Sequence, residues 1–363
     1  MSQNNTNILY VGLDVAKLSL ELHLAGRLHT LANDAKGHAQ ILKLLRRHPQ
    51  THVVCEATGG YEQPVVRALH AAGLPVSIVE AGRVRYFARA QGQRAKTDPI
   101  DAAVLSAYGT TFHPPATVPA SPQQQRLADL SQRRRQLIHS LTVEINRAEH
   151  YTDPLCRRQA RQLHKTLEKQ IKQCDQAIAK IIAEDAVLAH KAQRLDAIPG
   201  VGPVVAATVL AEMPELGQLN RQTAAALAGV SPYNRDSGGQ KGVRHISGGR
   251  RPVRCALYMA TLSAVRYDRI LKEFYLRLRA AGKKPLVAIT ACMRKLVILM
   301  NHLLKNQTFP LHTEHRCFVE PNPNQIKVFA NGHPLQPATS GAASSGRVIV
   351  AADVSRLISI RAD

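Results

Sequence analysis

The hexapeptide Lys96-Thr97-Asp98-Pro99-Ile100-Asp101 decides how the rest of the chain is interpreted. Pro99 suits the start of a helix, because it lacks an N–H that would have no partner there and its φ is already near the helical value. Asp98 then falls at the N-cap and Asp101 lies one turn later, so both carboxylates share a face. Taken alone, the pair has a simpler explanation: Asp98 caps the helix, and the negative charge of Asp101 interacts favourably with the positive end of the helix dipole.

Two earlier acids change that interpretation, because each ends an apolar run that reads as a strand. Asp14 ends the run 8–14, and Glu56 ends the run 52–56. Four carboxylates from two strand ends and one helix start are expected to gather at one edge of a sheet. Such a cluster repels itself unless a divalent cation neutralises it, and hard oxygen ligands suit Mg²⁺. The pattern predicts a two-metal phosphoryl-transfer site.

The order of the predicted elements supports this site. Apolar runs broken by short turns predict three antiparallel strands, then a helix, then alternating strands and helices. The strands fall at 8–14, 18–24, 28–31, 52–56 and 75–79, and the helices at 37–48, around Val65, Val66 and Leu69, and from Asp98 onward. This is the order of a ribonuclease H-like domain, whose acidic centre uses the first strand, the fourth strand and the last helix.

Composition bounds the function. The chain has 363 residues, a net charge of +22 and a pI near 10.2, which predicts a polyanionic partner, most commonly nucleic acid. Aromatic residues make up 4% and Trp is absent, so base stacking is not expected to be the main mode of binding.

The six cysteines include no C-x-x-C pair, which argues against a zinc ribbon or a disulfide framework. The polar start is no signal peptide, and the apolar stretch 286–304 contains Arg294 and Lys295. We therefore expect a cytoplasmic protein without a membrane span.

The middle of the chain predicts a helical hairpin. A proline-rich linker follows Thr110, and beyond it two sets of apolar residues recur at helical spacing on either side of Asp153-Pro154. The narrow apolar seams indicate a coiled coil. The polar faces are either simply solvated or contact the backbone of RNA or DNA, and the excess of positive charge favours the second. Their cations include Arg133, Arg134, Arg135, Arg157 and Arg158.

Two glycine-rich stretches follow. Pro199-Gly200-Val201-Gly202 between predicted helices is typical of a helix-hairpin-helix, in which glycine lets backbone N–H groups approach a phosphate; a plain turn is the alternative. The stretch 234–251 is dense in glycine and cations and holds Ser237 and Ser247, each followed by two glycines. Each serine could be a turn residue or a nucleophile that attacks a phosphodiester whose charge the cations offset. The residues alone do not show which of the two serines is the better candidate.

The chain after Pro310 changes character to turn and linker composition. His312 and His315 have the spacing of metal ligands, but without a third ligand a metal site is disfavoured. We expect no chemistry from this tail.

The quoted motifs resemble one family, the DEDD insertion-sequence transposases related to the Piv DNA invertase, which are bridge-RNA-guided serine recombinases. The matching motifs of the N-terminal half are 12–15, 56–59 and 96–101, and those of the C-terminal region are 199–202 and 234–238. The likeness extends from the first strand to about Leu304. It implies an α/β plus all-α protein: a RuvC-like ribonuclease H-fold domain (1–112), a linker with basic coiled-coil helices (113–193), a helical transposase domain with the helix-hairpin-helix and the serine loop (194–308), and a tail (309–363).

The resemblance also implies the mechanism. Ser237 maps to the nucleophile and Ser247 is the lesser candidate, while Asp14, Glu56, Asp98 and Asp101 hold Mg²⁺ and help to activate the serine. A phosphoserine link would conserve the bond energy, so that strands rejoin without ATP. The implied partners are donor and target DNA and a structured guide RNA, bound by a tetramer acting on nucleoid DNA in a bacterial cytoplasm.

The expected nucleic-acid contacts are spread along the chain. They are Arg83, Arg85, Arg89, Lys96, Arg133, Arg134, Arg135, Arg157, Arg158, Gly200, Gly202, Arg235, Lys241, Arg244, Arg250 and Arg251. Two other functions are compatible with the residues. One is a metal-dependent nuclease in which the acids activate water, and the other is a non-catalytic nucleic-acid-binding regulator.

Overall fold

The computed structural model describes residues 8–306 and Thr308, except Arg94, Lys96, Arg235, Gln240 and Lys241. The chain forms two compact units, one up to Ala120 and one from Ser121. The finer division expected at 112/113, 193/194 and 308/309 remains a prediction. His312, His315 and the rest of the tail lie outside the described residues, as do the predicted contact residues Lys96, Arg235 and Lys241.

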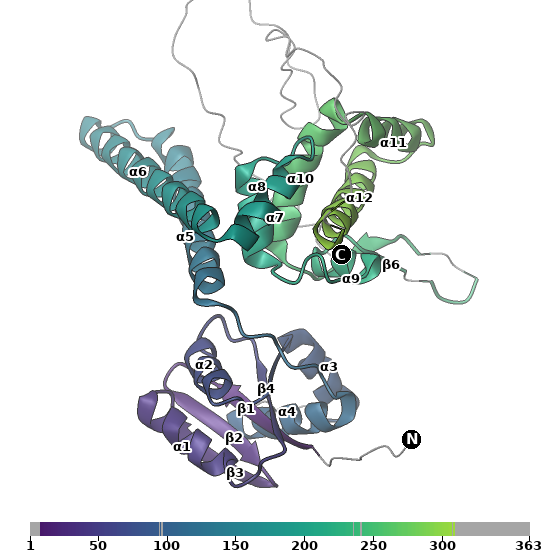
Figure 1. The fold of residues 1–363 in the computed structure, drawn as a ribbon. Helices are drawn as coiled ribbons and strands as arrows, with labels where there is room; N and C mark the ends of the chain where they lie inside the picture. Colours follow the sequence, from purple (N-terminus) through teal and green to yellow (C-terminus); the bar gives the residue numbers. More distant parts are fainter. Residues whose placement is uncertain are drawn as a thin grey trace, which may run out of the picture. The chain divides into compact units, whose positions relative to one another are not determined.

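The first unit is a five-stranded mixed sheet with helices on both faces (Figure 1). The strand order is β3-β2-β1-β4-β5, in which β1, β2 and β3 are antiparallel and β4 and β5 run parallel to β1. The strands are β1 (Leu9–Val15), β2 (Ser19–Leu24), β3 (Arg27–Ala32), β4 (Thr51–Glu56) and β5 (Val76–Val79). The helices are α1 (Ala35–Leu45), α2 (Gln63–Ala71), α3 (Ala81–Ala90) and α4 (Asp98–Phe112). All five predicted strands are confirmed.

Alternation along the strands divides the core of this unit in two. Val11, Leu13 and Val15 of β1 pack with buried residues of α1 and α2. Tyr10 of β1 and Val54 of β4 pack instead with buried residues of α3 and α4. Figure 1 shows the same arrangement, with α1 and α2 on one side of the sheet and α3 and α4 on the other.

Helix α4 lies unusually close to β1, because glycine occupies both sides of the contact. A Cβ added to Gly12 would overlap the carbonyl oxygen of Ala102 and come within 2.6 Å of the Ser106 backbone nitrogen. On the helix, a Cβ added to Gly109 would lie 2.7 Å from the ring of Tyr10. The Ser106 hydroxyl donates a 2.7 Å hydrogen bond to the carbonyl oxygen of Tyr10. The helix is thus fixed against the strand by packing and by a polar contact.

Two sequence expectations for this unit need correction. Asp98 is the first residue of α4 rather than its N-cap, which is Thr97, so Pro99 occupies the second helical position. Proline is tolerated there for the same reason, because the N–H groups of the first turn have no helical partner. The expected helices also leave out residues Ala81–Ala90, an arginine-rich segment after β5, which form α3.

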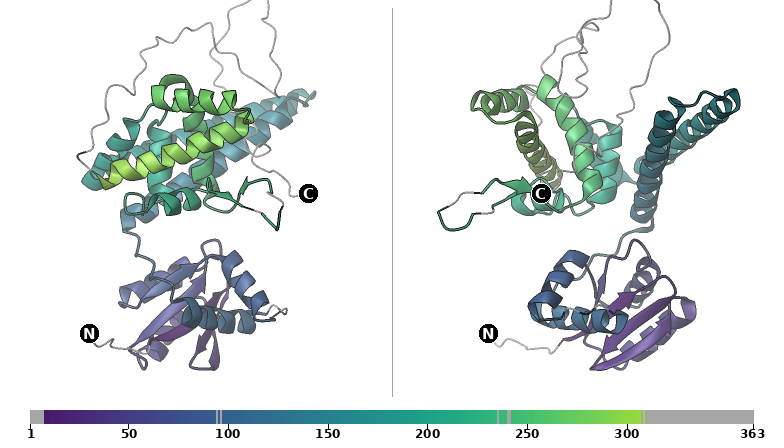
Figure 2. Two further views of the ribbon diagram at one scale, coloured as in Figure 1. Left: turned by 90° about the vertical axis from the view of Figure 1, so that its right-hand side faces the viewer. Right: turned by 180° about the vertical axis from the view of Figure 1, so that it is seen from behind.

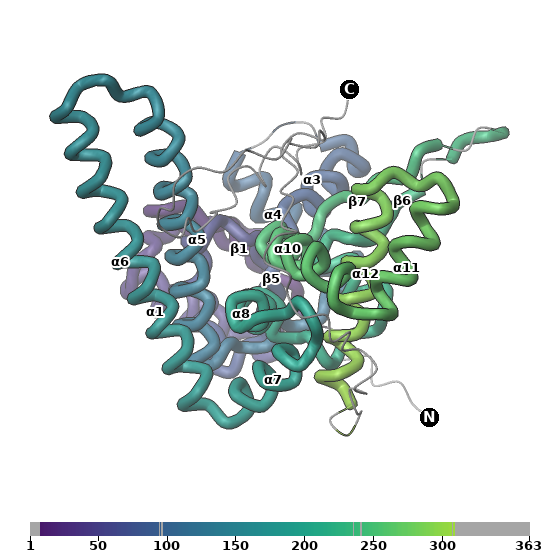
Figure 3. Tube along the Cα trace, turned by 90° about the horizontal axis from the view of Figure 1, so that it is seen from above, coloured from purple at the N-terminus to yellow at the C-terminus, as the bar shows by residue number. Residues whose placement is uncertain are grey.

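The described part of the second unit is helical apart from a short β-hairpin. Its elements are α5 (Pro122–Ala148), α6 (Pro154–Glu184), α7 (Ala186–Asp196), α8 (Pro203–Glu212), α9 (Arg221–Leu227), β6 (Pro232–Tyr233), β7 (His245–Ile246), α10 (Arg251–Tyr267), α11 (Arg269–Ala280) and α12 (Pro285–Lys305). Helices α5 and α6 form the predicted hairpin, with a seam that includes Leu137, Leu141 and Leu167. Figure 3 shows this hairpin extending from the body that the other helices form.

Helix α12 is long and apolar enough to cross a membrane by length and composition, but half of it is buried inside the unit. Cys292, Leu296, Val297 and Met300 are fully or almost fully enclosed in the main core of the unit. Its contacts are with α7, α9, α10 and α11. These contacts agree with the expected buried helix.

The close contact at Gly12 makes the first testable prediction. Gly12→Ala should destabilise the first unit by about 3 kcal/mol, because the new methyl group forces α4 away from β1. The loss of stability is measured in the full chain by the hydrogen-exchange protection of the β1 amides and, independently, by denaturant unfolding. Gly82→Ala is the matched control, since a Cβ added there would meet nothing closer than 3.6 Å. This substitution should stabilise α3 by about 0.5–1 kcal/mol, because alanine is a better helix former than glycine. Equal protection in the two variants would contradict the packing argument.

Candidate active site

The sheet places Asp14 and Glu56 side by side. In the parallel register Leu13 pairs with Cys55, so the next residues of the two strands are these two acids. By the alternation of the strands, Asp14 lies on the same face as Tyr10 and Gly12, and Glu56 on the same face as Val54. This is the face covered by α4, whose first turn carries Asp98 and Asp101.

The other three acids act on the charge of Asp14. The pKa of Asp14 is raised from 3.8 to about 6, first by burial and then by the negative charges of Asp101, Asp98 and Glu56. A hydrogen bond with the Val15 backbone opposes this shift. Glu56, Asp98 and Asp101 therefore lie near enough to Asp14 to act on its charge, and the expected joint site of four carboxylates stays a prediction.

Glu56, Asp98 and Asp101 are close enough to repel the charge of Asp14, but the four acids do not form a compact ligand shell. Within the part of the chain that the structure describes, no three His, Cys, Asp or Glu side chains are grouped tightly enough to hold a metal ion. The donor set still suits a hard divalent cation, since carboxylate oxygens are the ligands that Mg²⁺ uses and a cation would cancel the repulsion that raises the pKa of Asp14.

Two polar residues that sequence reasoning missed hold the strand ends around this cluster. Asn33 donates through its side-chain amide to the carbonyl oxygens of Ala16, 2.9 Å away, and Tyr61, 3.3 Å away. Its side-chain oxygen lies 2.9 Å from Nε2 of His38. Asn33 therefore ties the chain that follows β1 to the loop that follows β4. No sequence pattern marks it, because its partners are distant in the chain.

The second missed residue is Glu62, which is buried within that loop. Its Oε2 accepts hydrogen bonds from the backbone nitrogens of Thr58, at 3.1 Å, and Gly60, at 2.9 Å. The hydroxyl of Thr58 also donates to it. Burial opposes the ionisation of Glu62, but the hydrogen bonds outweigh burial and lower its pKa. The carboxylate thus folds the loop that begins directly after Glu56.

A further acid lies opposite Asp14 across the antiparallel pair. Glu21 of β2 is in register with Asp14 and is buried. Its Oε2 accepts a 2.8 Å hydrogen bond from the Thr30 hydroxyl. That bond commits the Glu21 side chain to β3, and we assign it a structural role.

The glycine-rich stretch of the second unit forms a protruding hairpin (Figure 2). Strands β6 and β7 pair antiparallel at its base, and both Ser237 and Ser247 are exposed. Asp236 accepts a 3.1 Å hydrogen bond from the Gly242 backbone, which closes the tip around Ser237. Ser247 lies at the base, beside Gly248, whose carbonyl oxygen accepts a hydrogen bond from Arg254. Because both serines are exposed, exposure does not identify which of them is the nucleophile.

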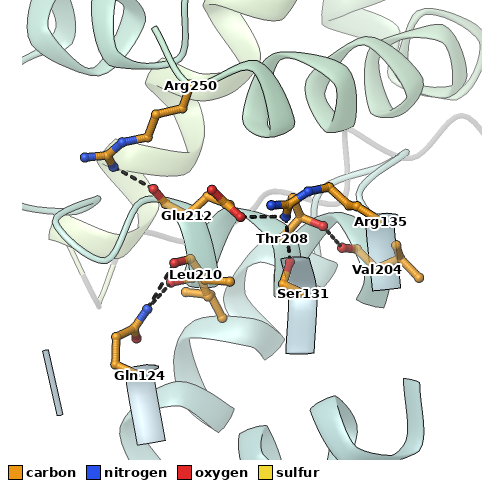
Figure 4. Close-up of polar contacts among 9 residues, drawn as sticks. Gln124, Ser131, Arg135, Val204, Thr208, Leu210, Glu212 and Arg250 are labelled. Carbon is orange, nitrogen blue, oxygen red and sulfur yellow. Dashed lines mark hydrogen bonds and ion pairs between the residues drawn. The ribbon is translucent and has the colours of Figure 1, made fainter. Parts of the chain in front are cut away.

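Two predicted nucleic-acid contacts, Arg135 and Arg250, also make bonds within the second unit (Figure 4). Arg135 of α5 pairs with Glu212 at the end of α8 and donates to Ser131. Arg250 pairs with Glu215 and donates to the carbonyl oxygen of Glu212. Figure 4 also shows Gln124 donating to the carbonyl oxygen of Leu210. The bonds from Arg250 and Gln124 satisfy carbonyl groups that the end of α8 leaves without helical partners.

The remaining predicted nucleic-acid contacts differ in whether their side chains are bonded within the chain or exposed. Arg134 pairs with Asp175 across the hairpin of α5 and α6. Arg157 is exposed but donates to the carbonyl oxygen of Tyr151. The residues whose exposure leaves them open to a ligand are Arg83, Arg89, Arg133, Arg158, Arg244 and Arg251, with Arg85 half-buried.

The two glycines of the predicted helix-hairpin-helix have different surroundings. Gly200 has a φ of +88°, and an added Cβ would come within 2.6 Å of the Ala260 carbonyl oxygen and 2.7 Å of the Ala264 nitrogen, both in α10. Its lack of a side chain is explained by packing. Gly202 is the N-cap of α8 and has open space around its Cα, so it remains available for a phosphate.

Comparison with known proteins gives two matches to family profiles. A transposase profile named DEDD_Tnp_IS110 matches residues 11–156, which include all four acids. A profile described as "Transposase IS116/IS110/IS902 family" matches residues 192–276, which include the exposed serines.

Individual relatives agree with the profiles. The chain is 28% identical over 310 residues to the "Pilin gene-inverting protein" of Moraxella bovis, covering 80% of this chain and 94% of that protein. The protein of the same name from Moraxella lacunata is 27% identical over the same share of both chains. An uncharacterized 44.8 kDa protein of the insertion element IS116 from Streptomyces clavuligerus is 27% identical over 39% of this chain and 35% of its own.

The repulsion within the acid cluster makes a prediction for the metal-free protein. A raised pKa means that the folded state binds this proton more tightly than the unfolded state does, so Asp14 lowers stability as the pH rises from 4 to 6. Asp14→Asn should therefore stabilise the chain by about 1–2 kcal/mol at pH 7 in EDTA, after allowance for solvent screening, and by much less at pH 4.

Thermal unfolding at the two pH values measures this difference. Glu80→Gln, an exposed acid at the end of β5, is the control and should have little effect. A loss of stability in Asp14→Asn at pH 7 would show that the carboxylates do not repel one another.

Proposed function

Because the chain belongs to the IS110/IS116 family of transposases, we propose that it cuts and rejoins DNA strands through two sets of residues, an acidic centre and a loop serine. The observation that carries the proposal is the meeting of Asp14, Glu56, Asp98 and Asp101 on one face of the sheet, within the segment that the first transposase profile matches. The strand order β3-β2-β1-β4-β5 is consistent with a RuvC-like ribonuclease H fold.

The four carboxylates would hold divalent cations, for which we propose Mg²⁺. A bound cation would neutralise charge on the scissile phosphate and favour the ionised form of an attacking hydroxyl. The contribution of the chain itself is positional. Gly12 lets α4 approach β1, Asn33 ties the ends of the strands, and Glu62 folds the loop behind Glu56.

We propose Ser237 as the nucleophile, with Ser247 as the alternative. Its hydroxyl is exposed at the tip of a hairpin in which Asp236 fixes the backbone. Its Oγ would form a bond to phosphorus while the bond to one DNA oxygen breaks, and that oxygen would leave as a hydroxyl carrying the proton. The reverse reaction with another strand's hydroxyl rejoins the DNA and frees the serine.

The partners follow from charge and from the resemblance described above. Donor and target DNA suit a chain of net charge +22 with exposed Arg133, Arg158, Arg244 and Arg251. From the resemblance we propose that a structured guide RNA pairs with both DNAs, that the protein acts as a tetramer, and that it works on nucleoid DNA in the cytoplasm.

The serine mechanism is tested by trapping. With a nicked suicide substrate, the wild-type chain should form a covalent protein–DNA adduct, and Ser237→Ala should reduce it by at least 10³-fold, because the loss of a nucleophile removes several kcal/mol of catalysis. Ser247→Ala, the matched exposed serine of the same hairpin, should retain the adduct. Retention by Ser237→Ala and loss by Ser247→Ala would transfer the role to Ser247.

The same assay separates the two competing functions. A nuclease that activates water would cut the substrate without any adduct in either serine variant. A non-catalytic regulator would retain its biological activity in Asp98→Asn and Asp101→Asn, whereas the proposed enzyme should lose both cutting and recombination in these variants.

A further inference from the structure

Helix α3 carries an unusual combination of residues. The segment 81–97 contains Arg83, Arg85, Arg89, Arg94 and Lys96 but no Asp or Glu. Within it, Tyr86 is 73% exposed, which makes it the most exposed aromatic side chain of the described residues. An aromatic ring of this size usually buries most of its surface. Its exposure among cations therefore needs an explanation.

Helical geometry places the ring at the centre of the solvent-facing side. Val84 and Ala88 are buried on the opposite side, against the sheet and α4. At 100° per residue, Arg83 and Arg89 flank Tyr86 at 60° on either side. The exposed face of α3, formed by Arg83, Tyr86 and Arg89, thus presents one flat ring between two cations.

The face is rigid because aromatic contacts join α3 to α4. The ring of Phe87 packs edge-on against Tyr108 at 5.6 Å and against Phe112 at 5.5 Å between centroids. Tyr108 and Phe112 also contact each other at 4.8 Å. The helix that presents Tyr86 is thereby fixed to the helix whose first turn carries Asp98 and Asp101.

The arginines of α3 are uncompensated within the part of the chain that the structure describes. Among the described residues, the side chains of Arg83, Arg85 and Arg89 have no hydrogen bond and no ion pair. This differs from Arg134, Arg135 and Arg250, each of which pairs with a carboxylate. Uncompensated charge beside an exposed ring matches the chemistry of a polyanion that carries flat bases.

We propose that the exposed face of α3 binds an unpaired nucleotide, with its base stacked on Tyr86 and its neighbouring phosphates held by Arg83 and Arg89. The ligand is unpaired because the bases of a duplex are already stacked on one another and offer no free face to a single ring. This inference rests on the proposed function only in assuming that the chain handles nucleic acid. It adds a strand-binding surface on the helix that precedes the Asp98 turn.

Binding to labelled oligonucleotides in EDTA, where no strand is cut, tests the proposal on the full chain. Tyr86→Ala should weaken binding of a single-stranded 15-mer by about 5- to 150-fold, the range expected for the loss of one stacked base. Tyr86→Phe, which keeps the ring, should stay within about twofold of wild type. Binding of the duplex of the same sequence should change by less than about twofold in either variant. DNA and RNA versions of the strand show which sugar is preferred.

Two matched controls and a local measurement complete the experiment. Tyr267→Ala removes an exposed tyrosine of the second unit, and Arg47→Ala removes an exposed cation beyond α1, on the other face of the sheet; neither should alter the preference for the single strand. Ultraviolet crosslinking of a strand that contains 5-iodouracil should label the peptide with Tyr86. Equal weakening of single strand and duplex by Tyr86→Ala, or crosslinks only outside residues 81–90, would overturn the proposal.

These outcomes are separate from those of the serine assay. If Tyr86→Ala leaves single-strand binding unchanged while Ser237→Ala still abolishes the adduct, the α3 surface is wrong and the proposed function holds. If the adduct never forms but Tyr86→Ala still weakens the single strand selectively, the proposed chemistry fails and the binding surface holds.

Discussion

The close contact between β1 and α4 is the constraint on which the acidic centre depends. Gly12 on the strand and Gly109 on the helix remove the side chains that would keep the two apart. The Ser106 hydroxyl then bonds the helix to the carbonyl oxygen of Tyr10. Because Asp98 and Asp101 begin α4, this packing carries two carboxylates to the edge of the sheet where Asp14 and Glu56 already lie.

This arrangement disfavours the ionised form of Asp14. Burial and three nearby negative charges raise the pKa of Asp14 to about 6, so the fold holds a carboxylate where its ionised form is disfavoured. The chain resists separation of these groups with Asn33, which joins the two strand ends, and with Glu62, which anchors the loop after Glu56. Such local conflict is typical of a functional site rather than of a structural core.

The sequence predicts the acidic centre because its determinants are local. The apolar runs of β1 and β4, and a proline at the start of α4, are enough to assign strand ends, a helix start and a shared edge. The one-residue error at Asp98 reflects only how closely a helix boundary can be assigned. Helix α3 was missed because three arginines interrupt its apolar residues and hide their helical spacing.

The basic residues could not be sorted by sequence, since their partners are distant in the chain. Arg135 pairs with Glu212, 77 residues away, and Gly200 owes its small size to α10. Arg134 and Arg250 were likewise grouped with nucleic-acid contacts before their carboxylate partners could be known. Charge that is compensated within the fold therefore looks the same in the sequence as charge left for a ligand.

The central proposal is that Asp14, Glu56, Asp98 and Asp101 come together around one bound cation. Crystals of the full chain soaked in Mn²⁺ and measured at the manganese absorption edge test it most directly. The account predicts an anomalous peak in contact with Asp14 and with at least one carboxylate from β4 or α4, and no such peak in crystals of Asp14→Asn. Manganese bound only at other side chains, or a peak that survives in Asp14→Asn without change, would contradict it.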